Sequence, residues 1–279
     1  MPYNKVPRIV ASFKCSEAAA KNAGVATHRA QRNTAQRGDA LVLLQSLPDS
    51  CTPLVFFDPQ FRGVLDKLDY GNEGARQRGR SELPAMSADY IDSVCRESAR
   101  VLKPSGYLLR WTDTFHLCQG DHLRITEFQC VDLIAWDSLC MGMGYRSRRR
   151  GDYLLALQKP PIVAKATWRD HGIPSRWVEK IENPRSQHPH AKPIGLIGRL
   201  IGAVTQPGEL VVDPAAGSFV VMRAALQLGR EFIGCDAAYE SAPIHPRPTS
   251  RSAPMPSPES PRRYTLKDLP LLRRKGLVP

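Results

Sequence analysis

Residues 211–219, VVDPAAGSF, are the segment most informative about the fold. Their apolar beginning, which follows Leu210, predicts a short buried strand that stops at Asp213. Gly217 predicts a turn directly after this strand, and apolar residues at helical spacing predict a helix over Ser218–Leu228. The chain therefore passes from a strand through a glycine-containing turn into a helix, which is typical of an α/β unit.

The next predicted strand, residues 231–235, ends at Asp236, nineteen residues after Gly217. In nucleotide-binding α/β units, a turn like that at Gly217 lets a ligand approach the backbone. An acidic residue about 20 positions later accepts hydrogen bonds from ribose hydroxyls. The complete GxGxxG pattern is missing, which argues against a dinucleotide. Taken alone, Gly217 and Asp236 fit a second interpretation equally well, in which the glycine makes a structural turn and the acid happens to end a strand.

Strands and helices alternate through the rest of the chain, which predicts an α/β sheet. Helical spacing of apolar residues predicts one helix after Ser87, a plausible N-cap, and another that begins at Pro193. Short apolar runs predict additional strands at residues 54–57, 107–111, 131–136 and 153–157.

Composition divides the chain into three parts. Residues 1–36 are irregular and basic, residues 37–240 carry the predicted strands and helices, and residues 241–279 hold nine prolines and eight basic residues against two acids. We expect the last part to be a disordered tail. Within the central part, residues 62–86 lack periodicity and are expected to form a mobile loop, and residues 159–187 a short variable insert.

Charge and cysteine content narrow the class of protein. The 279 residues include 39 Lys and Arg against 27 Asp and Glu, a formal net charge of +12, which favours a polyanionic partner such as nucleic acid. The seven cysteines are scattered without a CxxC pair, which predicts reduced thiols in a cytosol and no zinc site. No apolar run is long enough to span a membrane, and the first residues lack the apolar core of a signal peptide.

A second motif, FFDPQF at residues 56–61, follows a predicted buried strand. It combines the carboxylate of Asp58, the rigid turn of Pro59 and the ring of Phe61. Such a loop can hold a planar base, because the ring stacks on the base while the carboxylate and a backbone carbonyl accept hydrogen bonds from an exocyclic amine. A strand-terminal turn with Phe61 in the core fits the same residues.

Two further segments place polar residues beside predicted elements. HPHAKP, residues 188–193, leads into a helix, and its two histidines have no third ligand for a metal. We therefore expect this segment to close one side of a ligand pocket. RGD, residues 37–39, puts Asp39 about 20 residues before the second motif. The Asp39 side chain is expected to face either a ligand or, in a surface turn, the solvent.

In this order, the four motifs resemble the S-adenosylmethionine-dependent DNA amino-methyltransferases of the permuted β class. In that family an Asp-Pro-Pro-Tyr/Phe catalytic motif precedes an Asp-Pro-Phe-x-Gly-Ser-Gly cofactor motif, with His-Pro-x-x-Lys-Pro just upstream of the latter. Residues 101–106 and 136–153 also resemble parts of the family, so the likeness covers about residues 37–240. It implies a Rossmann-like methyltransferase sheet, mostly parallel with one antiparallel strand, with helices on both faces.

The resemblance also implies a role for each matching residue. The cofactor would be S-adenosylmethionine, and no metal would be needed. The substrate would be the exocyclic N6 of an adenine flipped out of DNA, because aspartate at the first catalytic position is more typical of adenine-N6 than of cytosine-N4 enzymes. The catalytic residues would be Asp58, Pro59, Gln60 and Phe61. The cofactor-binding residues would be Asp39, Lys192, Pro193, Asp213, Pro214, Ala216, Gly217, Ser218 and Asp236.

Three positions depart from the family's pattern. Gln60 replaces the second proline of the catalytic motif, Ala215 replaces a phenylalanine, and Phe219 replaces the last glycine of the cofactor motif. Phe219 places bulk where the backbone approaches the methionine end of the cofactor. The alternatives are a cytosine-N4 or RNA amino-methyltransferase, or a catalytically inactive relative that binds nucleic acid. The permuted motif order argues against an enzyme that acts on protein glutamine.

Basic residues are expected to hold the backbone of double-stranded DNA. The candidates are Arg76, Arg78 and Arg80 in the 62–86 loop, and Arg148, Arg149 and Arg150 in a glycine-rich turn between two predicted strands. The insert at residues 159–187 is too short for a large target-recognition domain, so we expect base recognition to involve the 62–86 loop or a partner subunit in a homodimer. The expected location is the cytoplasm, with the nucleoid, in a prokaryotic or phage-encoded setting.

Overall fold

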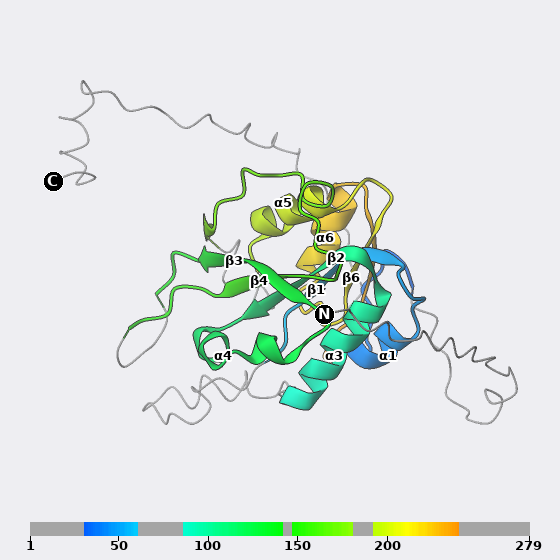
Figure 1. Ribbon diagram of the computed structural model, residues 1–279, viewed down its shortest axis with the longest axis horizontal. Helices are drawn as coiled ribbons and strands as arrows, with labels where there is room; N and C mark the ends of the chain where they lie inside the picture. Colours follow the sequence, from blue (N-terminus) through cyan, green and yellow to red (C-terminus); the bar gives the residue numbers. More distant parts are fainter. Residues whose placement is uncertain (1–30, 61–85, 142–146, 181–191, 240–279) are drawn as a thin grey trace, which may run out of the picture. The chain divides into compact units, whose positions relative to one another are not determined.

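A computed structural model describes residues 31–60, 86–141, 147–180 and 192–239, which all belong to one compact unit within residues 1–240. Figure 1 shows a sheet flanked by helices. The strands are β1 (Thr52–Phe57), β2 (Leu102–Thr112), β3 (Gln129–Asp137), β4 (Tyr153–Gln158), β5 (Arg176–Val178), β6 (Leu210–Asp213) and β7 (Glu231–Gly234). The helices are α1 (Ala40–Gln45), α3 (Ala88–Val101), α4 (Thr114–Gln119), η2 (Asp121–Arg124), α5 (Ile194–Val204) and α6 (Val220–Gln227).

These seven strands form one sheet in the order β5-β3-β4-β2-β1-β6-β7. β1 pairs in parallel with β2 and β6, β6 pairs in parallel with β7, and β3 pairs in parallel with β5. Among the described strands, only β4 runs against its neighbours, since it is antiparallel to both β2 and β3. The expected sheet, mostly parallel with one antiparallel strand, is confirmed.

β1 lies between two apolar layers. Leu54 and Phe56 contribute to the cluster formed with α5 and α6, whereas Val55 and Phe57 contribute to the cluster formed with α1 and α3. All four side chains are at most 1% exposed. A strand covered by helices on both faces buries every side chain, which explains the continuous apolar run at residues 54–57. The expected placement of helices on both faces is confirmed (Figure 1).

The predicted helices are found with small shifts at their ends. The Ser87 Oγ caps α3 by accepting from the Tyr90 backbone N–H at 3.2 Å. Pro193 is the N-cap of α5 rather than its first residue. α6 begins at Val220 because Phe219 adopts a left-handed backbone conformation, with φ of 53°. The helix predicted to reach Leu228 ends one residue earlier, because Leu228 is the C-cap of α6, and this side chain is 36% exposed instead of packing inward with the apolar face of the helix.

Four short elements were not predicted from the sequence: α1, α4, η2 and β5. Each spans six residues or fewer, which is too short for a hydrophobic period to be recognised. β5 lies in the insert at residues 159–187 and pairs with β3 at the edge of the sheet. The described part of the insert therefore extends the sheet of this unit.

Glu179, just after β5, joins this edge of the sheet to α5. Its backbone oxygen accepts from the Trp136 indole at 2.9 Å. Its carboxylate accepts from the Gly195 and Leu196 backbone N–H groups at 2.8 and 3.0 Å, and from the Trp177 indole at 2.6 Å. A carboxylate at a helix N-terminus satisfies backbone donors that lack partners in the helix and complements the helix dipole. Glu179 thereby stabilises the first turn of α5, which begins two residues after Lys192.

Gly151 allows β3 and β4 to approach each other closely. A Cβ at this position would lie 1.7 Å from the Trp136 carbonyl oxygen, so Gly151→Ala should push the strands apart and destabilise the protein by about 1–3 kcal/mol. The matched control is Gly198→Ala in α5, where nothing lies within 4 Å of the added methyl group; it should stabilise by about 0.5–1 kcal/mol. Urea unfolding measures both effects, and equal stabilities of the two variants would contradict the close approach at Gly151.

Candidate active site

A cleft lies outside the carboxyl ends of β1, β6 and β7. From β1 the chain crosses through α3 to β2, and from β6 it crosses through α6 to β7, so the two crossovers diverge from the centre of the sheet. Ligands of open α/β sheets bind where neighbouring connections diverge in this way. The cleft has an empty volume of about 960 Å³, part of it open to solvent. All four motifs contribute to its lining, through Asp39, Asp58, Lys192, Asp213, Gly217 and Asp236.

The turn after β6 presents backbone to the cleft. The Asp213 carboxylate accepts from the Ala215 backbone N–H at 3.2 Å, and the Ala216 N–H donates to the Cys235 carbonyl at 2.9 Å. Gly217 has φ of 48°, a left-handed conformation that favours glycine. Pro214, Ala216 and Ser218, the other residues predicted here, also line the cleft.

Phe219 points away from the cleft. Its side chain is 5% exposed and makes edge-to-face contacts with Phe232 and Tyr239, with ring centroids 6.4 and 5.0 Å apart. Phe219 is not among the residues that line the cleft. The expectation that this residue places bulk against the cofactor site is therefore wrong. Its left-handed backbone turns the ring into the core beneath α6.

Asp236 is held at the cleft by two backbone groups. Its Oδ2 accepts from the Gly217 N–H at 3.0 Å, and its Oδ1 accepts from the Ala238 N–H at 2.9 Å. Each carboxylate oxygen has a second lone pair that can accept from another donor. A rigid carboxylate beside the Gly217 turn is suited to bind vicinal hydroxyls, as the nineteen-residue spacing suggested.

Asp39 has two structural partners in addition to its place in the cleft. Its Oδ1 caps α1 by accepting from the Leu41 and Val42 N–H groups at 2.9 and 3.0 Å. Its Oδ2 accepts from the Tyr90 hydroxyl at 2.6 Å. Burial, followed by the neighbouring Asp39, raises the pKa of Tyr90 to about 12, so the phenol stays protonated and donates. Tyr90 also lines the cleft, and sequence reasoning missed it.

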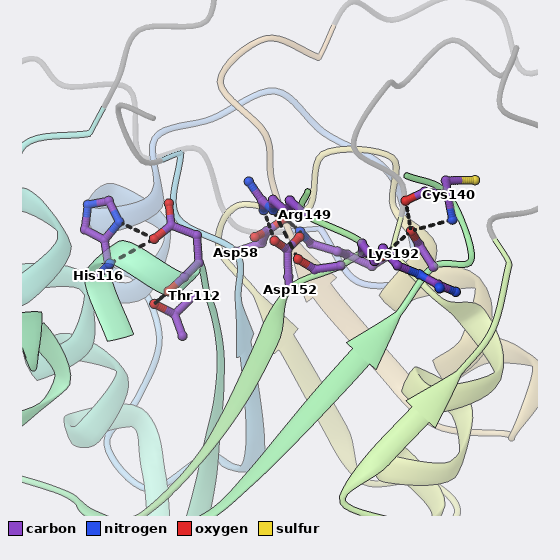
Figure 2. Close-up of polar contacts among 11 residues, drawn as sticks. Asp58, Thr112, His116, Cys140, Arg149, Asp152 and Lys192 are labelled. Carbon is purple, nitrogen blue, oxygen red and sulfur yellow. Dashed lines mark hydrogen bonds and ion pairs between the residues drawn. The ribbon is translucent and has the colours of Figure 1, made fainter. Parts of the chain in front are cut away.

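Asp58 and Lys192, from different motifs, form an ion pair. The Lys192 Nζ lies 3.2 Å from the Asp58 Oδ2 and 3.1 Å from the Asp152 Oδ2, and 5.0 Å from the centroid of the Trp111 ring. Figure 2 shows Asp58, Lys192 and Asp152 meeting where the strands end. Lys192 was predicted to complete the cofactor wall; the structure places it against the proposed catalytic carboxylate as well. Asp152 was not among the predicted site residues.

Of the other predicted residues in these motifs, one lines the cleft, two are buried behind its surface, and one lies outside the described residues. Gln60 lines the cleft, and its backbone oxygen accepts from the Met86 N–H at 3.1 Å. Pro59 and Pro193 are buried and do not line the cleft. Phe61 lies outside the described residues, so its expected stacking on a base stays a prediction.

An apolar wall completes the cleft. Phe56 and Trp111 come from the neighbouring strands β1 and β2, Ile197 comes from α5, and Val220 and Val221 come from α6. Sequence reasoning placed these residues in strands and helices but not at the site, because periodicity does not distinguish a side chain that fills the interior from one that borders a cavity. Such an apolar surface can receive the flat face of a base or of an adenosyl group.

Negative charge dominates the lining of the cleft. Four carboxylates, those of Asp39, Asp58, Asp213 and Asp236, face one ammonium, that of Lys192. Burial raises the pKa of Asp213 well above the usual value of an aspartate, and the charges of Asp58 and Asp236 raise it further against a smaller lowering by the Ala215 N–H. An acidic cleft in a chain with a formal net charge of +12 fits a cationic ligand and disfavours phosphates.

Two of the arginines predicted to bind DNA have partners within the protein. Arg149 pairs with Asp152 and donates to the Gly151 carbonyl at 3.1 Å. Arg150 pairs with Asp137 at 3.1 Å. Arg148 is exposed beside them. Arg76, Arg78 and Arg80 lie outside the described residues, and a role in DNA binding stays a prediction for all six.

The described residues hold neither a metal-binding cluster nor a helix that could cross a membrane. Within residues 31–60, 86–141, 147–180 and 192–239, no three His, Cys, Asp or Glu side chains are grouped so that they could hold a metal ion. None of the helices in these segments combines the length and apolar character that crossing a membrane requires.

Comparisons with known proteins agree with this geometry. Residues 54–244 match the model of a DNA methylase family that comprises N6 and N4 methyltransferases. The Type II methyltransferase M.HhaII of Haemophilus parahaemolyticus is 44% identical over 211 residues, which are 74% of this chain and 92% of that protein.

Solved structures show the same fold at lower identity. A putative DNA modification methylase from Thermus thermophilus, complexed with S-adenosyl-L-methionine, has a TM-score of 0.51 and 22% identity over 73% of this chain and 87% of its own. The cytosine-N4-specific PvuII DNA methyltransferase has a TM-score of 0.55 and 18% identity over 73% of this chain and 81% of its own. The family match over residues 54–244 and the 44% identity to M.HhaII identify this chain as a member of the N6/N4 DNA methylase family.

Proposed function

We propose that this protein transfers the methyl group of S-adenosylmethionine to the exocyclic N6 of an adenine in a specific DNA sequence. Its family consists of DNA methylases. The proposal therefore concerns which base receives the methyl group and which residues carry out the transfer. The observation that carries the proposal is that Asp58 lines the same acidic cleft as the Gly217 turn and Asp236, so the two motifs share one site. Asp58 at the first position of its motif favours adenine.

The residues of the cleft fit this cofactor. S-adenosylmethionine is a sulfonium that also carries an ammonium group and two ribose hydroxyls, and when bound it supplies an electrophilic methyl group without a metal. Asp236 would accept from the ribose hydroxyls, and Asp213 and the Gly217 turn would hold the methionine end. Asp39 would accept from the adenine amine, with Tyr90 holding that carboxylate in place. Positive charge on the ligand relieves the repulsion among the carboxylates.

The chemical difficulty lies in the nucleophile. The lone pair of an aromatic amine is delocalised into the ring, which makes the nitrogen a weak attacking atom. Asp58, which lines the cleft, would accept one N–H of the amine. The backbone carbonyl of Pro59, which is buried in the cofactor-free protein, would accept the other once the base displaces what covers it, and the two acceptors together would concentrate the lone pair on the nitrogen. Acceptors that favour positive charge developing on this nitrogen act mainly in the transition state, so they raise the rate rather than the affinity.

The amine is inaccessible inside a duplex, so the base would be flipped into the cleft and held against an aromatic surface. Trp111 and Phe56 border the cleft near Asp58 and offer part of this surface, with Phe61 as the stacking residue that the sequence suggests. Double-stranded DNA, a homodimer and a cytoplasmic, prokaryotic or phage-encoded setting remain predictions from the sequence.

The product distinguishes adenine from cytosine. Incubating the protein with duplex DNA and labelled S-adenosylmethionine, then digesting the DNA to nucleosides, should give labelled N6-methyladenine at one recurring sequence. Label in N4-methylcytosine would assign the protein to the alternative substrate. Binding of cofactor without any transfer to DNA or RNA would favour the inactive relative.

Substitutions of Asp58 and Asp236, one from each motif, should separate catalysis from cofactor binding. Asp58→Ala should slow methyl transfer by about 10²–10³-fold or more while the cofactor Kd changes only a few-fold. Asp236→Ala should weaken cofactor binding, because it removes the carboxylate held beside Gly217. Calorimetric titration and single-turnover transfer measure the two effects, and the reverse pattern would exchange the roles assigned to the two motifs.

Asp213→Asn should make the cofactor-free protein more stable and should weaken cofactor binding. The raised pKa means that the folded state holds the proton more tightly than the unfolded state, so ionisation of Asp213 reduces stability as the pH rises above 3.8 towards the folded-state pKa. Asparagine abolishes this loss and can still accept from the Ala215 N–H. Loss of a charge-assisted contact of about 1.5–3 kcal/mol should weaken cofactor binding about 10- to 100-fold. Thermal melts with and without cofactor test both effects, and a lower melting temperature of the free variant would contradict this account.

Arg148 offers a test of the DNA interface that leaves the ion pairs of Arg149 and Arg150 intact. If Arg148 contacts a phosphate, Arg148→Ala should weaken binding to every DNA sequence and reduce the slope of log affinity against log salt by about 0.9. The control is Lys165→Ala, which removes one charge from the segment between Val163 and Thr167. Both of these residues accept from Gln158, at the end of β4 that lies away from the cleft. An unchanged salt slope for Arg148→Ala would remove this residue from the interface and favour the arginines of the 62–86 loop.

A further inference from the structure

The Lys192 ammonium is shared between two carboxylates. Its Nζ lies 3.2 Å from the Asp58 Oδ2 and 3.1 Å from the Asp152 Oδ2 (Figure 2). The Nζ also lies over the Trp111 ring, 5.0 Å from its centroid. The Lys192 side chain is 12% exposed and that of Asp152 is 13% exposed. A lysine ammonium has three N–H donors, so two carboxylates and an aromatic face can together fix its position.

Asp152 lies directly before β4 and has two partners of its own. Its backbone oxygen accepts from the Trp136 N–H at 2.9 Å, which ties it to β3, and its Oδ1 pairs with Arg149. Four alternating charges therefore run from the turn between β3 and β4 to the cleft: Arg149, Asp152, Lys192 and Asp58. None of the four motifs recognised in the sequence contains Asp152.

The balance between the two carboxylates affects Asp58. With Asp152 ionised, the charge of Lys192 is divided between two equidistant partners. Without it, the ammonium would have Asp58 as its remaining carboxylate partner among these residues and would compete with the substrate amine for the same acceptor. In a half-buried site this competition is strong, because the charges are screened less than in water.

We propose that Asp152 is a positioning residue for methyl transfer: it holds Lys192 away from full pairing with Asp58, so that the Asp58 carboxylate remains an acceptor for the amine of the target base. The inference rests on the proposed function, since it takes Asp58 as that acceptor. It explains why a largely buried carboxylate stands next to Lys192 although Asp152 belongs to none of the four motifs. A purely structural Asp152 would instead serve only to anchor Arg149 and the turn.

The experiment compares Asp152→Asn with Asp137→Asn in the full-length protein. Asp137 is a matched control: it lies at the end of β3, is 11% exposed, and pairs with Arg150 and Arg176 rather than with Lys192. Single-turnover methyl transfer should be about tenfold slower or more in Asp152→Asn. The cofactor Kd and the DNA Kd should be unchanged, and Asp137→Asn should transfer at nearly the wild-type rate.

Further variants make the result decisive. Asp152→Glu keeps the charge and should recover part of the lost rate, and Asp152→Ser replaces Asp152→Asn if the latter does not fold. In a double-mutant cycle, removing Asp152 in a Lys192→Gln background should cost much less than in the wild type, because the competing ammonium is gone.

Two results would overturn the proposal: a wild-type rate in Asp152→Asn, or an equal loss in Asp137→Asn. Asp58→Ala, measured in parallel, separates this proposal from the one on which it rests. If Asp58→Ala loses transfer while Asp152→Asn does not, only the positioning role fails. If Asp58→Ala transfers normally, the assignment of Asp58 as the acceptor fails as well.

Discussion

The parallel pairing of β1 with β6 at the centre of the sheet is the constraint on which the site depends. Because both strands are buried and run in the same direction, their carboxyl ends open at one edge. The crossovers through α3 and α6 then leave in opposite directions. A crevice results at a single place, and Asp58 and Asp213 end their strands at its floor although 155 positions separate them in the chain.

This concentration of acids has an electrostatic cost. Asp213 is 4% exposed, and its raised pKa reflects burial first and the neighbouring carboxylates second. Hydrogen bonds from backbone N–H groups and the ion pair with Lys192 offset part of this cost. Functional sites commonly retain such unfavourable groups because a ligand of opposite charge relieves them. Here that ligand is a sulfonium, which is the chemistry of the proposed cofactor.

The position of Lys192 depends on a region that carries no recognisable motif. Glu179 caps α5 and accepts from Trp136 and Trp177, and so joins the β3–β5 edge of the sheet to the helix that follows Lys192. Asp152 completes the arrangement from β4. The short insert therefore has a structural role in the catalytic unit, because it adds β5 and delivers Glu179 to the end of α5.

The sequence alone was sufficient for the fold class and for the four motifs, because strands, turns and helices leave local periodic signals and the motif residues lie directly at strand ends. It also identified Asp236 from its distance to Gly217, a relation that the structure realises as a hydrogen bond. The tertiary structure was needed to learn that Lys192 pairs with Asp58, that Tyr90 holds Asp39, and that Phe219 turns into the core. These contacts join segments far apart in the chain or follow from one left-handed backbone angle, and neither leaves a periodic signal in the order of residues. Asp152 was missed for the same reason: its partners come from other elements, and their meeting point is set by how β4, β1 and α5 pack.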